Sequence, residues 1–173
     1  MRIAQVCPTY HPSIGGVQTH VRELSVRLAK KGFEIEIITT DPSRELKQEE
    51  VLDGIRIRRF NSWAPSSAYY FSQDLKEYLM KKSHDYDVVH AHSYHAFPAL
   101  YAAQAKSRNK FVFTAHYHGT GHTLLRRLLH IPYKFIGTRI FQKADRIVCV
   151  SKYERTLITD HFEVNGKTVV IPN

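Results

Sequence analysis

Paired glycines and a set of histidines are the residues of this chain best suited to chemistry. Gly15 and Gly16 lie between a short apolar run and an amphipathic segment, so they predict a tight turn that opens a helix. The first turn of a helix carries backbone N–H groups without partners and the positive end of the helix dipole, and both favour anions such as phosphate. Because paired glycines also serve purely as turns, the phosphate hypothesis depends on the residues around them.

A group of histidines follows the pattern His-x-His-x-x-His. His90, His92 and His95 have the spacing of a metallohydrolase cluster, with Tyr94 where such a cluster has its acid. Imidazoles two residues apart on an extended segment point to one side and could share a zinc ion. The missing carboxylate removes a usual ligand, so hydrogen bonding within a cleft is the favoured interpretation and no metal site is expected. A zinc-dependent hydrolase is kept as an alternative.

Another histidine follows a predicted strand in the segment Thr114-Ala115-His116-Tyr117-His118. A histidine at this place can simply cap the strand. If it faces the same crevice as the glycine turn, its imidazole can donate a hydrogen bond to a ligand hydroxyl or stabilise charge in a transition state. The second interpretation is favoured for His116, because both features follow strands of one predicted sheet.

Short apolar runs bounded by turn residues predict the strands that position these groups. Most of the runs are rich in β-branched residues and do not alternate, as expected of parallel strands covered on both faces. The predicted strands are Ile3–Cys7, Phe33–Thr39, Ile55–Phe60, Asp87–Ala91, Phe111–Ala115, Ile147–Val150 and Thr168–Ile171. The predicted helices are Val17–Leu28, the region around Leu75 and Leu79, Ala96–Ala105, Tyr133–Lys143 and Lys152–Phe162.

Alternating strands and helices over this length predict an α/β fold with a doubly wound parallel sheet. In such sheets, ligands bind outside the carboxyl ends of the strands, near the point where the strand order reverses. The candidate residues follow predicted strands, so one cleft could collect them. The polar segment 41–53, between the second and third strands, is predicted to be a solvated loop, with a mobile flap over a bound ligand as the alternative.

The composition is that of one globular domain. The 173 residues are 43% hydrophobic and 24% charged. No apolar run reaches the roughly 18 residues that a membrane helix needs, and no signal peptide is recognised before the first strand. Cys7 and Cys149 lie in predicted strands without a metal-binding or paired spacing, so they are expected to be buried thiols in a reducing cytoplasm.

The net charge of +9 is unevenly distributed, because no acidic residue occurs between Asp87 and Asp145. This basic stretch favours anionic partners, namely phosphorylated ligands, lipid head groups or nucleic acid. Residues 124–139 mix leucines, aromatics and cations and could lie on an anionic membrane surface, although a core-packed helix pair explains the pattern nearly as well. No nucleic-acid motif accompanies the charge, and the glycine motifs of dehydrogenases and P-loop enzymes are missing.

Several motifs, taken in order, resemble the N-terminal half of the group 1 glycosyltransferases, a large retaining family with the two-domain GT-B fold. The motifs are Pro12 with Gly15-Gly16 and His20, Lys31-Gly32-Phe33-Glu34-Ile35, Asp87-Val88-Val89-His90-Ala91-His92, Thr114-Ala115-His116, Ala144-Asp145-Arg146-Ile147-Val148-Cys149-Val150-Ser151 and Val170-Ile171-Pro172-Asn173. Phe33 stands where the family has a histidine. The resemblance covers essentially the whole chain and implies a Rossmann-like N-terminal domain over residues 1–173.

The resemblance implies a role for each matching position. Gly15 and Gly16 would bind the diphosphate of a nucleotide-sugar donor, and His116 would be the catalytic residue in contact with the transferred sugar. The acceptor side would be lined by His11, Gln18, His20, His92, Tyr94, Tyr117 and His118. The nucleotide-sugar is a substrate, so no cofactor is expected.

The resemblance also implies a second domain. In the family, Val-Ile-Pro-Asn leads into a C-terminal domain that binds the nucleotide and carries a Glu-x7-Glu element, whereas this sequence stops at Asn173. The chain is therefore expected to be the acceptor-binding half of a cytoplasmic transferase, inactive alone, that acts on a sugar, lipid or small-molecule acceptor and could touch the inner face of a membrane. A non-catalytic module for an anionic ligand or membrane, and a sugar-nucleotide epimerase, are the alternatives. No nucleic-acid partner is expected.

Overall fold

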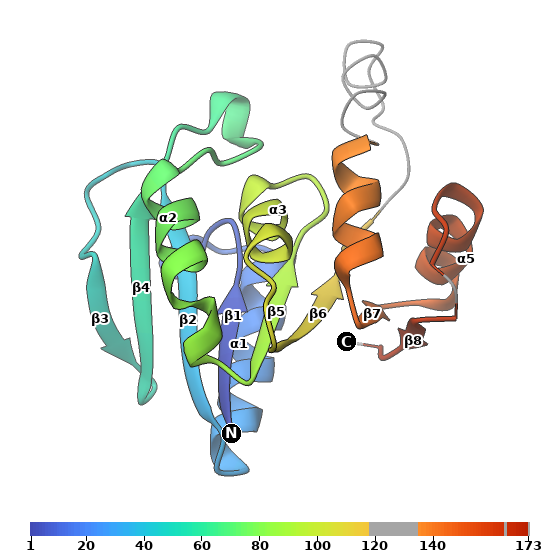
Figure 1. The fold of residues 1–173 in the computed structure, drawn as a ribbon. Helices are drawn as coiled ribbons and strands as arrows, with labels where there is room; N and C mark the ends of the chain where they lie inside the picture. The colour runs from blue at the N-terminus through green and yellow to red at the C-terminus, as the bar shows by residue number, and fades with distance from the viewer. Residues whose placement is uncertain (118–134, 165, 173) are drawn as a thin grey trace.

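The computed structural model describes residues 1–117, 135–164 and 166–172 (Figure 1). The strands are β1 (Arg2–Val6), β2 (Glu34–Asp41), β3 (Glu49–Leu52), β4 (Ile55–Asn61), β5 (Val88–His92), β6 (Lys110–Thr114), β7 (Arg146–Cys149) and β8 (Thr168–Val170). The helices are α1 (Gly16–Lys30), α2 (Gln73–Lys82), α3 (Phe97–Gln104) and α5 (Lys152–His161), with short 3₁₀ turns η1 (Pro65–Ser67) and η2 (Ser83–Asp85) and a further helix over residues 135–143. Every predicted element is present as far as the described residues reach, and the ends that can be compared shift by at most two positions. Residues 133–134, the predicted start of the helix that ends at Lys143, lie outside the described residues.

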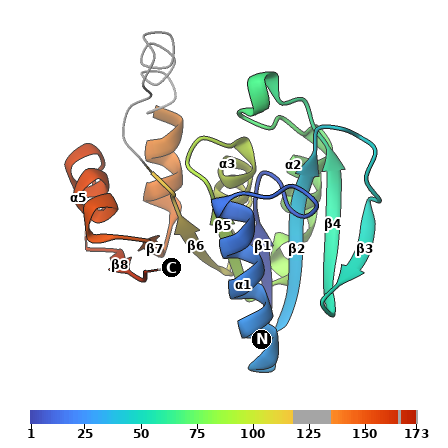
Figure 2. The same ribbon diagram turned by 180° about the vertical axis from the view of Figure 1, so that it is seen from behind.

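The strands form one sheet in the order β3-β4-β2-β1-β5-β6-β7-β8. All neighbouring strands are parallel except β3 and β4. Helix α1 covers one face of the sheet, and α2 and α3 cover the other (Figures 1 and 2). The predicted doubly wound parallel sheet is therefore confirmed.

Helix α1 packs an apolar stripe against the sheet half formed by β1, β2 and β4. Val21 is wholly buried and joins Ile3, Ile37 and Ile57 in one core cluster. The helix ends at Lys30, and the chain then turns at Gly32, whose φ of 86° favours glycine. Local sequence signals therefore set both the start and the end of α1.

The opposite face carries the larger core cluster. Leu75 and Leu79 of α2 lie in it with Phe111 and Phe113 of β6. Helix α2 begins after Ser72, whose hydroxyl accepts a hydrogen bond from the Leu75 N–H at 3.3 Å. The capping residue and the apolar spacing together set the position of α2 over the sheet.

Both cysteines are buried free thiols, as the sequence predicts. Burial raises the pKa of Cys7 to about 12 and that of Cys149 to about 11. The two thiols therefore stay protonated at neutral pH, where a thiol is a weak nucleophile.

The segment 41–53 is not the loop that the sequence predicts, because it contains the edge strand β3, antiparallel to β4. The Asp41 carboxylate fixes the start of the segment by accepting hydrogen bonds from the N–H groups of Ser43 and Leu46, both at 2.9 Å. A four-residue edge strand lacks the apolar run that marks the buried strands. Its pairing with β4 decides its structure instead.

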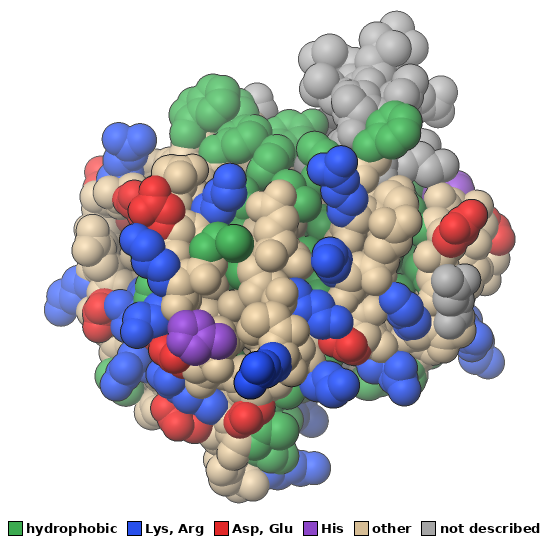
Figure 3. All heavy atoms as spheres, viewed as in Figure 1, with side chains coloured by type: hydrophobic (Ala, Val, Ile, Leu, Met, Phe, Trp, Pro, Cys, Tyr) green, Lys and Arg blue, Asp and Glu red, His purple; other side chains and the backbone are tan. Residues whose placement is uncertain are grey.

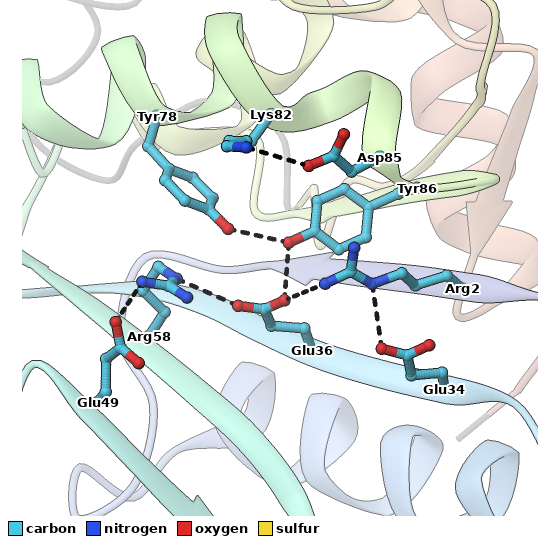
Figure 4. Close-up of polar contacts among 9 residues, drawn as sticks. All are labelled: Arg2, Glu34, Glu36, Glu49, Arg58, Tyr78, Lys82, Asp85 and Tyr86. Atoms are coloured by element: carbon cyan, nitrogen blue, oxygen red, sulfur yellow. Dashed lines mark hydrogen bonds and ion pairs between the residues drawn. The ribbon is translucent and has the colours of Figure 1, made fainter.

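A buried carboxylate, Glu36 of β2, lies near the amino ends of the strands and faces α2 (Figure 4). It accepts hydrogen bonds from Arg2 at 3.3 Å, from Arg58 at 3.1 Å and from the Tyr86 hydroxyl at 2.8 Å. The Tyr86 hydroxyl also lies 3.0 Å from the Tyr78 hydroxyl of α2. These five residues are called the Glu36 network below. They join β1, β2, β4 and α2 through the Glu36 carboxylate, whose charge is satisfied by hydrogen bonds.

The surface in Figure 3 carries many Lys and Arg side chains interspersed with acidic ones, whereas hydrophobic side chains gather at the end of the molecule that carries η1. Among the described residues, no helix combines the length and the apolar character needed to cross a membrane.

Candidate functional site

The strand order reverses between β1 and β5. From β1 the chain adds β2 and β4 on one side, and from β5 it adds β6, β7 and β8 on the other. Doubly wound sheets bind their ligands in the crevice outside the carboxyl ends of the strands at this point. Gly15 and Gly16 follow β1 and His92 ends β5, so the topology brings predicted site residues to this edge.

The glycine turn opens α1, as the sequence predicts. A Cβ at Gly15 would lie 2.6 Å from Oε1 of Gln18, so the glycine makes room for this side chain, whose Nε2 donates to Thr9 Oγ1 at 2.5 Å. A Cβ at Gly16 would meet nothing within 4 Å. The first turn of α1 also contains no acidic residue. The helix N-terminus is therefore open and free of competing negative charge, as an anion site requires.

Three histidines from separate elements meet at this edge of the sheet. His20 lies on α1, His92 ends β5 and His116 follows β6. The ring centroid of His20 is 5.6 Å from that of His92 and 5.2 Å from that of His116, and the rings of His92 and His116 are 6.0 Å apart. We call these three residues the histidine cluster. Each ring contacts both of the others, so the cluster is a single unit.

His92 is the most enclosed member of the histidine cluster. It has no exposed surface, its Nε2 lies 2.8 Å from Gln5 Oε1, and its ring packs 4.2 Å from that of His90. Burial, with a smaller effect of the neighbouring histidines, lowers the pKa of His92 well below its usual value. Burial also lowers the pKa of His90, which lies 2.8 Å from Thr114 Oγ1, to about 3. Both imidazoles are therefore neutral at physiological pH.

The backbone of His116 has a φ of 48°, a left-handed conformation that few residues other than glycine adopt. On the N-terminal side of His116, the Ala115 carbonyl accepts a hydrogen bond from the Tyr94 N–H at 2.7 Å, which joins the ends of β5 and β6. On the C-terminal side of His116, the Tyr117 N–H donates to the Glu154 carboxylate at 2.6 Å. Hydrogen bonds on both sides therefore hold His116 in a strained conformation, a feature found most often at functional sites.

Glu154 is a positioning residue that the sequence reasoning missed. It is buried, and its two carboxylate oxygens accept hydrogen bonds from the N–H groups of Tyr117 and Val150, both at 2.6 Å. Ser151 caps α5 by accepting from the Glu154 N–H at 3.0 Å. The Ser-x-x-Glu spacing is a helix-start signature visible in the sequence, but it gives no sign of the long-range bond to Tyr117.

The remaining predicted acceptor-side residues differ in their placement. His11 is exposed, and its carbonyl accepts a hydrogen bond from buried Arg59 at 2.6 Å. Tyr94 and Tyr117 are buried, with their rings 4.9 Å apart and exposures of 0% and 1%. Such packing of aromatic rings stabilises a core. His118 lies outside the described residues.

The metallohydrolase pattern is not assembled in the described part of the chain. His90 and His92 share one side of β5, as predicted, but His95 is exposed on the following segment. The ring nitrogens that do converge, within 4.8 Å of one another, belong to His20, His92 and His116. The histidines that converge therefore come from three separate elements and not from one local sequence pattern.

The sequence reasoning also missed an aromatic segment between β4 and α2. Trp63 is 63% exposed and stacks on Phe71, with ring centroids 5.5 Å apart, and Phe71 packs 4.2 Å from Phe97 of α3. A hollow of about 340 Å³ lies beside these rings. It is lined by Arg44, Asn61, Ser62, Trp63, Phe71, Ser72, Gln73 and Asp74. An exposed ring beside polar side chains can stack on a ligand and fix its orientation.

The sequence model of Glycosyltransferase Family 4 matches residues 14–173. The chain is 25% identical to alpha-monoglucosyldiacylglycerol synthase of Streptococcus pneumoniae, over 99% of this chain and 40% of that protein. It is also 25% identical to O-antigen chain mannosyltransferase C of Escherichia coli, over 99% of this chain and 45% of that protein. Sucrose-phosphate synthase from Thermosynechococcus elongatus has a similar fold, with a TM-score of 0.71 at 19% identity over 99% of this chain and 47% of that chain. The chain thus spans less than half the length of these proteins.

Proposed function

The chain belongs to Glycosyltransferase Family 4, and on that premise we propose that it is the acceptor-side half of a retaining enzyme that transfers a sugar from a nucleotide-sugar donor to an acceptor hydroxyl. One observation carries the proposal beyond the family. An open helix N-terminus at Gly16 and a strained histidine at position 116 occupy the edge where the strand order reverses. The first group suits a phosphate and the second suits a sugar.

The glycine turn would stabilise the leaving group. Negative charge grows on the diphosphate of the nucleotide-sugar as its bond to the sugar breaks. Hydrogen-bond donors that are already in place lower the barrier most where this charge develops. The first N–H groups of α1 are such donors. The open space beside Gly16, together with the lack of acidic residues in the first turn of α1, supports this role.

His116 would contact the transferred sugar. Its imidazole can donate a hydrogen bond to a sugar hydroxyl. A side chain that is already held in place loses little entropy when the substrate binds. The hydrogen bonds that flank His116 from Tyr94 to Ala115 and from Tyr117 to Glu154 support this preorganisation.

A second domain of the same protein would supply the nucleotide site. The coverage of 47% of sucrose-phosphate synthase supports a partner domain of comparable size. The acceptor would approach past His11 and the hollow beside Trp63. The names of the two curated relatives favour a lipid or a sugar as the first acceptors to test.

The alternative of a membrane-binding module without catalysis has no support from the described residues. Residues 118–134, the centre of the basic stretch, lie outside them, and Lys106 pairs with Asp145 at 2.9 Å. Cytoplasmic location and contact with a membrane therefore stay predictions. The family match favours transfer over sugar-nucleotide epimerisation.

The experiment that tests the proposal is Gly16→Asp, measured in the longest natural form of the protein with a panel of UDP-, GDP- and ADP-sugars. The new side chain enters open space, and an acid in the first turn of a helix is itself stabilising by about 0.3–1 kcal/mol, so the fold should be kept. The carboxylate would repel the diphosphate, and transfer should fall at least about 100-fold.

The matched control is Gly16→Asn, which has nearly the same size without the charge. It should retain most of the transfer activity that Gly16→Asp loses. Equal activity of Gly16→Asp and the unchanged protein would refute phosphate binding at this turn. Circular dichroism and the thermal midpoint would show that both variants fold.

A further inference from the structure

The histidine cluster brings three potential metal ligands together. We propose that His20, His92 and His116 form a site for a Zn²⁺-like transition-metal ion. One ring nitrogen of each residue lies within 4.8 Å of the other two. Around a tetrahedral ion with Zn–N bonds of about 2.0–2.1 Å, the ligand nitrogens are roughly 3.3 Å apart. Binding would therefore require side-chain rotation of His20 and His116, both of which are half-buried.

His92 makes the kind of hydrogen bond that fixes the ring of a metal ligand. Metal-binding histidines commonly donate their second ring N–H to an oxygen acceptor, which fixes the tautomer and the plane of the ring. Here Nε2 of His92 lies 2.8 Å from Gln5 Oε1, so the hydrogen belongs on Nε2 and the lone pair on Nδ1. Among the described residues, His92 Nδ1 is buried without a hydrogen-bond partner. A metal ion would use this lone pair.

The donor set selects the class of metal. Imidazole nitrogens suit Zn²⁺, Co²⁺, Ni²⁺ and Cu²⁺, whereas Mg²⁺ and Ca²⁺ prefer oxygen ligands. No carboxylate belongs to the converging set in the described residues. Three protein ligands also leave one position of a tetrahedral ion without a protein ligand.

Metal binding has a consequence for transfer, and this part rests on the proposed function. An ion on the cluster would tie His116 to α1 and β5 and would occupy the space where the donor sugar meets the imidazole. We therefore expect Zn²⁺ to inhibit transfer by competing with the nucleotide-sugar.

The binding test uses tag-free protein titrated with Co²⁺, whose visible absorption reports a tetrahedral nitrogen site. The protein should bind one Co²⁺ per chain, and added Zn²⁺ should displace it. In His20→Gln the affinity should fall by more than about 100-fold, because losing a ligand costs more than losing an outer partner, which itself costs about 10–100-fold. His20 lies on the partly exposed side of α1, so this variant should fold, and circular dichroism checks it.

The matched control is His95→Gln, which removes the exposed histidine of the sequence pattern and should leave Co²⁺ binding unchanged. Absence of a tetrahedral Co²⁺ spectrum, or equal affinity of His20→Gln and the unchanged protein, would overturn the site. Loss of binding in His95→Gln would do the same, in favour of the pattern around His90.

Inhibition is measured separately, as the ratio of transfer rates with and without Zn²⁺ at low and high donor concentration. Relief by excess donor, and loss of the effect in His20→Gln, would support competition at the cluster. Binding of Co²⁺ without inhibition by Zn²⁺ would reject competition and keep the site. If no sugar transfer is found at all, the proposed function fails while the Co²⁺ titration still decides the metal site.

Discussion

The Glu36 network and the histidine cluster are both buried polar groups, but they differ in how far their bonding capacity is used. The Glu36 network lies near the amino ends of the strands, where two guanidinium groups and a hydroxyl meet one carboxylate. The histidine cluster lies at the carboxyl edge, where the three rings contact one another edge-on or stacked. In the described part of the chain, His92 Nδ1 has no hydrogen-bond partner.

This difference separates a structural network from a candidate site. A carboxylate whose oxygens are already bonded can bind a ligand only by breaking existing contacts, and each broken contact leaves a buried group unpaired. An imidazole with an unused lone pair has no such cost. Burial of polar side chains therefore does not mark a functional site by itself, whereas unused bonding capacity at the carboxyl edge does.

The largest effect should come from breaking the Glu36 network. Glu36→Ala leaves Arg2 and Arg58 without their shared acceptor, so the free energy of unfolding should fall by about 3 kcal/mol. Urea unfolding measures this loss, and Co²⁺ binding by the histidine cluster should not change. Glu34→Ala removes a 71% exposed partner of the same Arg2 and should cost less than about 1 kcal/mol. Equal losses in the two variants would show that burial does not distinguish them.

An intermediate effect should come from Glu154, which supports the strained end of the histidine cluster. Glu154→Gln puts an amide NH₂ against a backbone N–H, so the variant should lose about 1–2 kcal/mol of stability. Hydrogen exchange at the Tyr117 and Val150 amides should accelerate more than elsewhere. The exposed Glu163→Gln is the control. Unchanged exchange at Tyr117 would mean that Glu154 does not hold the segment next to His116.

The smallest effect concerns pH and a second ion pair at the amino edge of the sheet. Asp145 accepts from the Phe111 N–H at 2.8 Å and pairs with Lys106 at 2.9 Å. Burial opposes ionisation of this carboxyl, but these contacts outweigh burial and lower its pKa below 3.8. The unfolded chain then binds the proton more readily than the folded one. The stabilisation is therefore present above about pH 4 and is lost as the pH falls through that value toward the lower folded pKa.

Asp145→Asn should flatten this part of the stability profile, measured as the thermal midpoint between pH 2.5 and 7. The exposed Asp160→Asn should leave the profile as it is. If the thermal midpoint of Asp145→Asn falls as steeply at acid pH as that of the unchanged protein, other carboxyls cause the loss of stability.

The order and type of the elements were predictable because their signals are local. Runs such as Phe111–Ala115 mark buried strands, and the spacing of Val21 and Leu24 marks the inner side of α1. The edge strand β3 escaped prediction, because its pairing with β4 decides its structure and its own four residues carry little signal.

The candidate site was predictable only in part. The glycine turn and His116 could be recognised, since each follows a strand within a few residues. The core positions of Tyr94 and Tyr117 and the role of Glu154 could not, because they depend on contacts between β5, β6 and α5.

The sequence by itself determined the alternation of strands and helices, the turn that opens α1 and the placement of histidines at strand ends, since all of these depend on neighbours along the chain. The tertiary structure alone decided which histidines meet. His20 joins His92 and His116, and His95 does not, because the strand order sets which elements become neighbours and the pleat sets which side chains share a face.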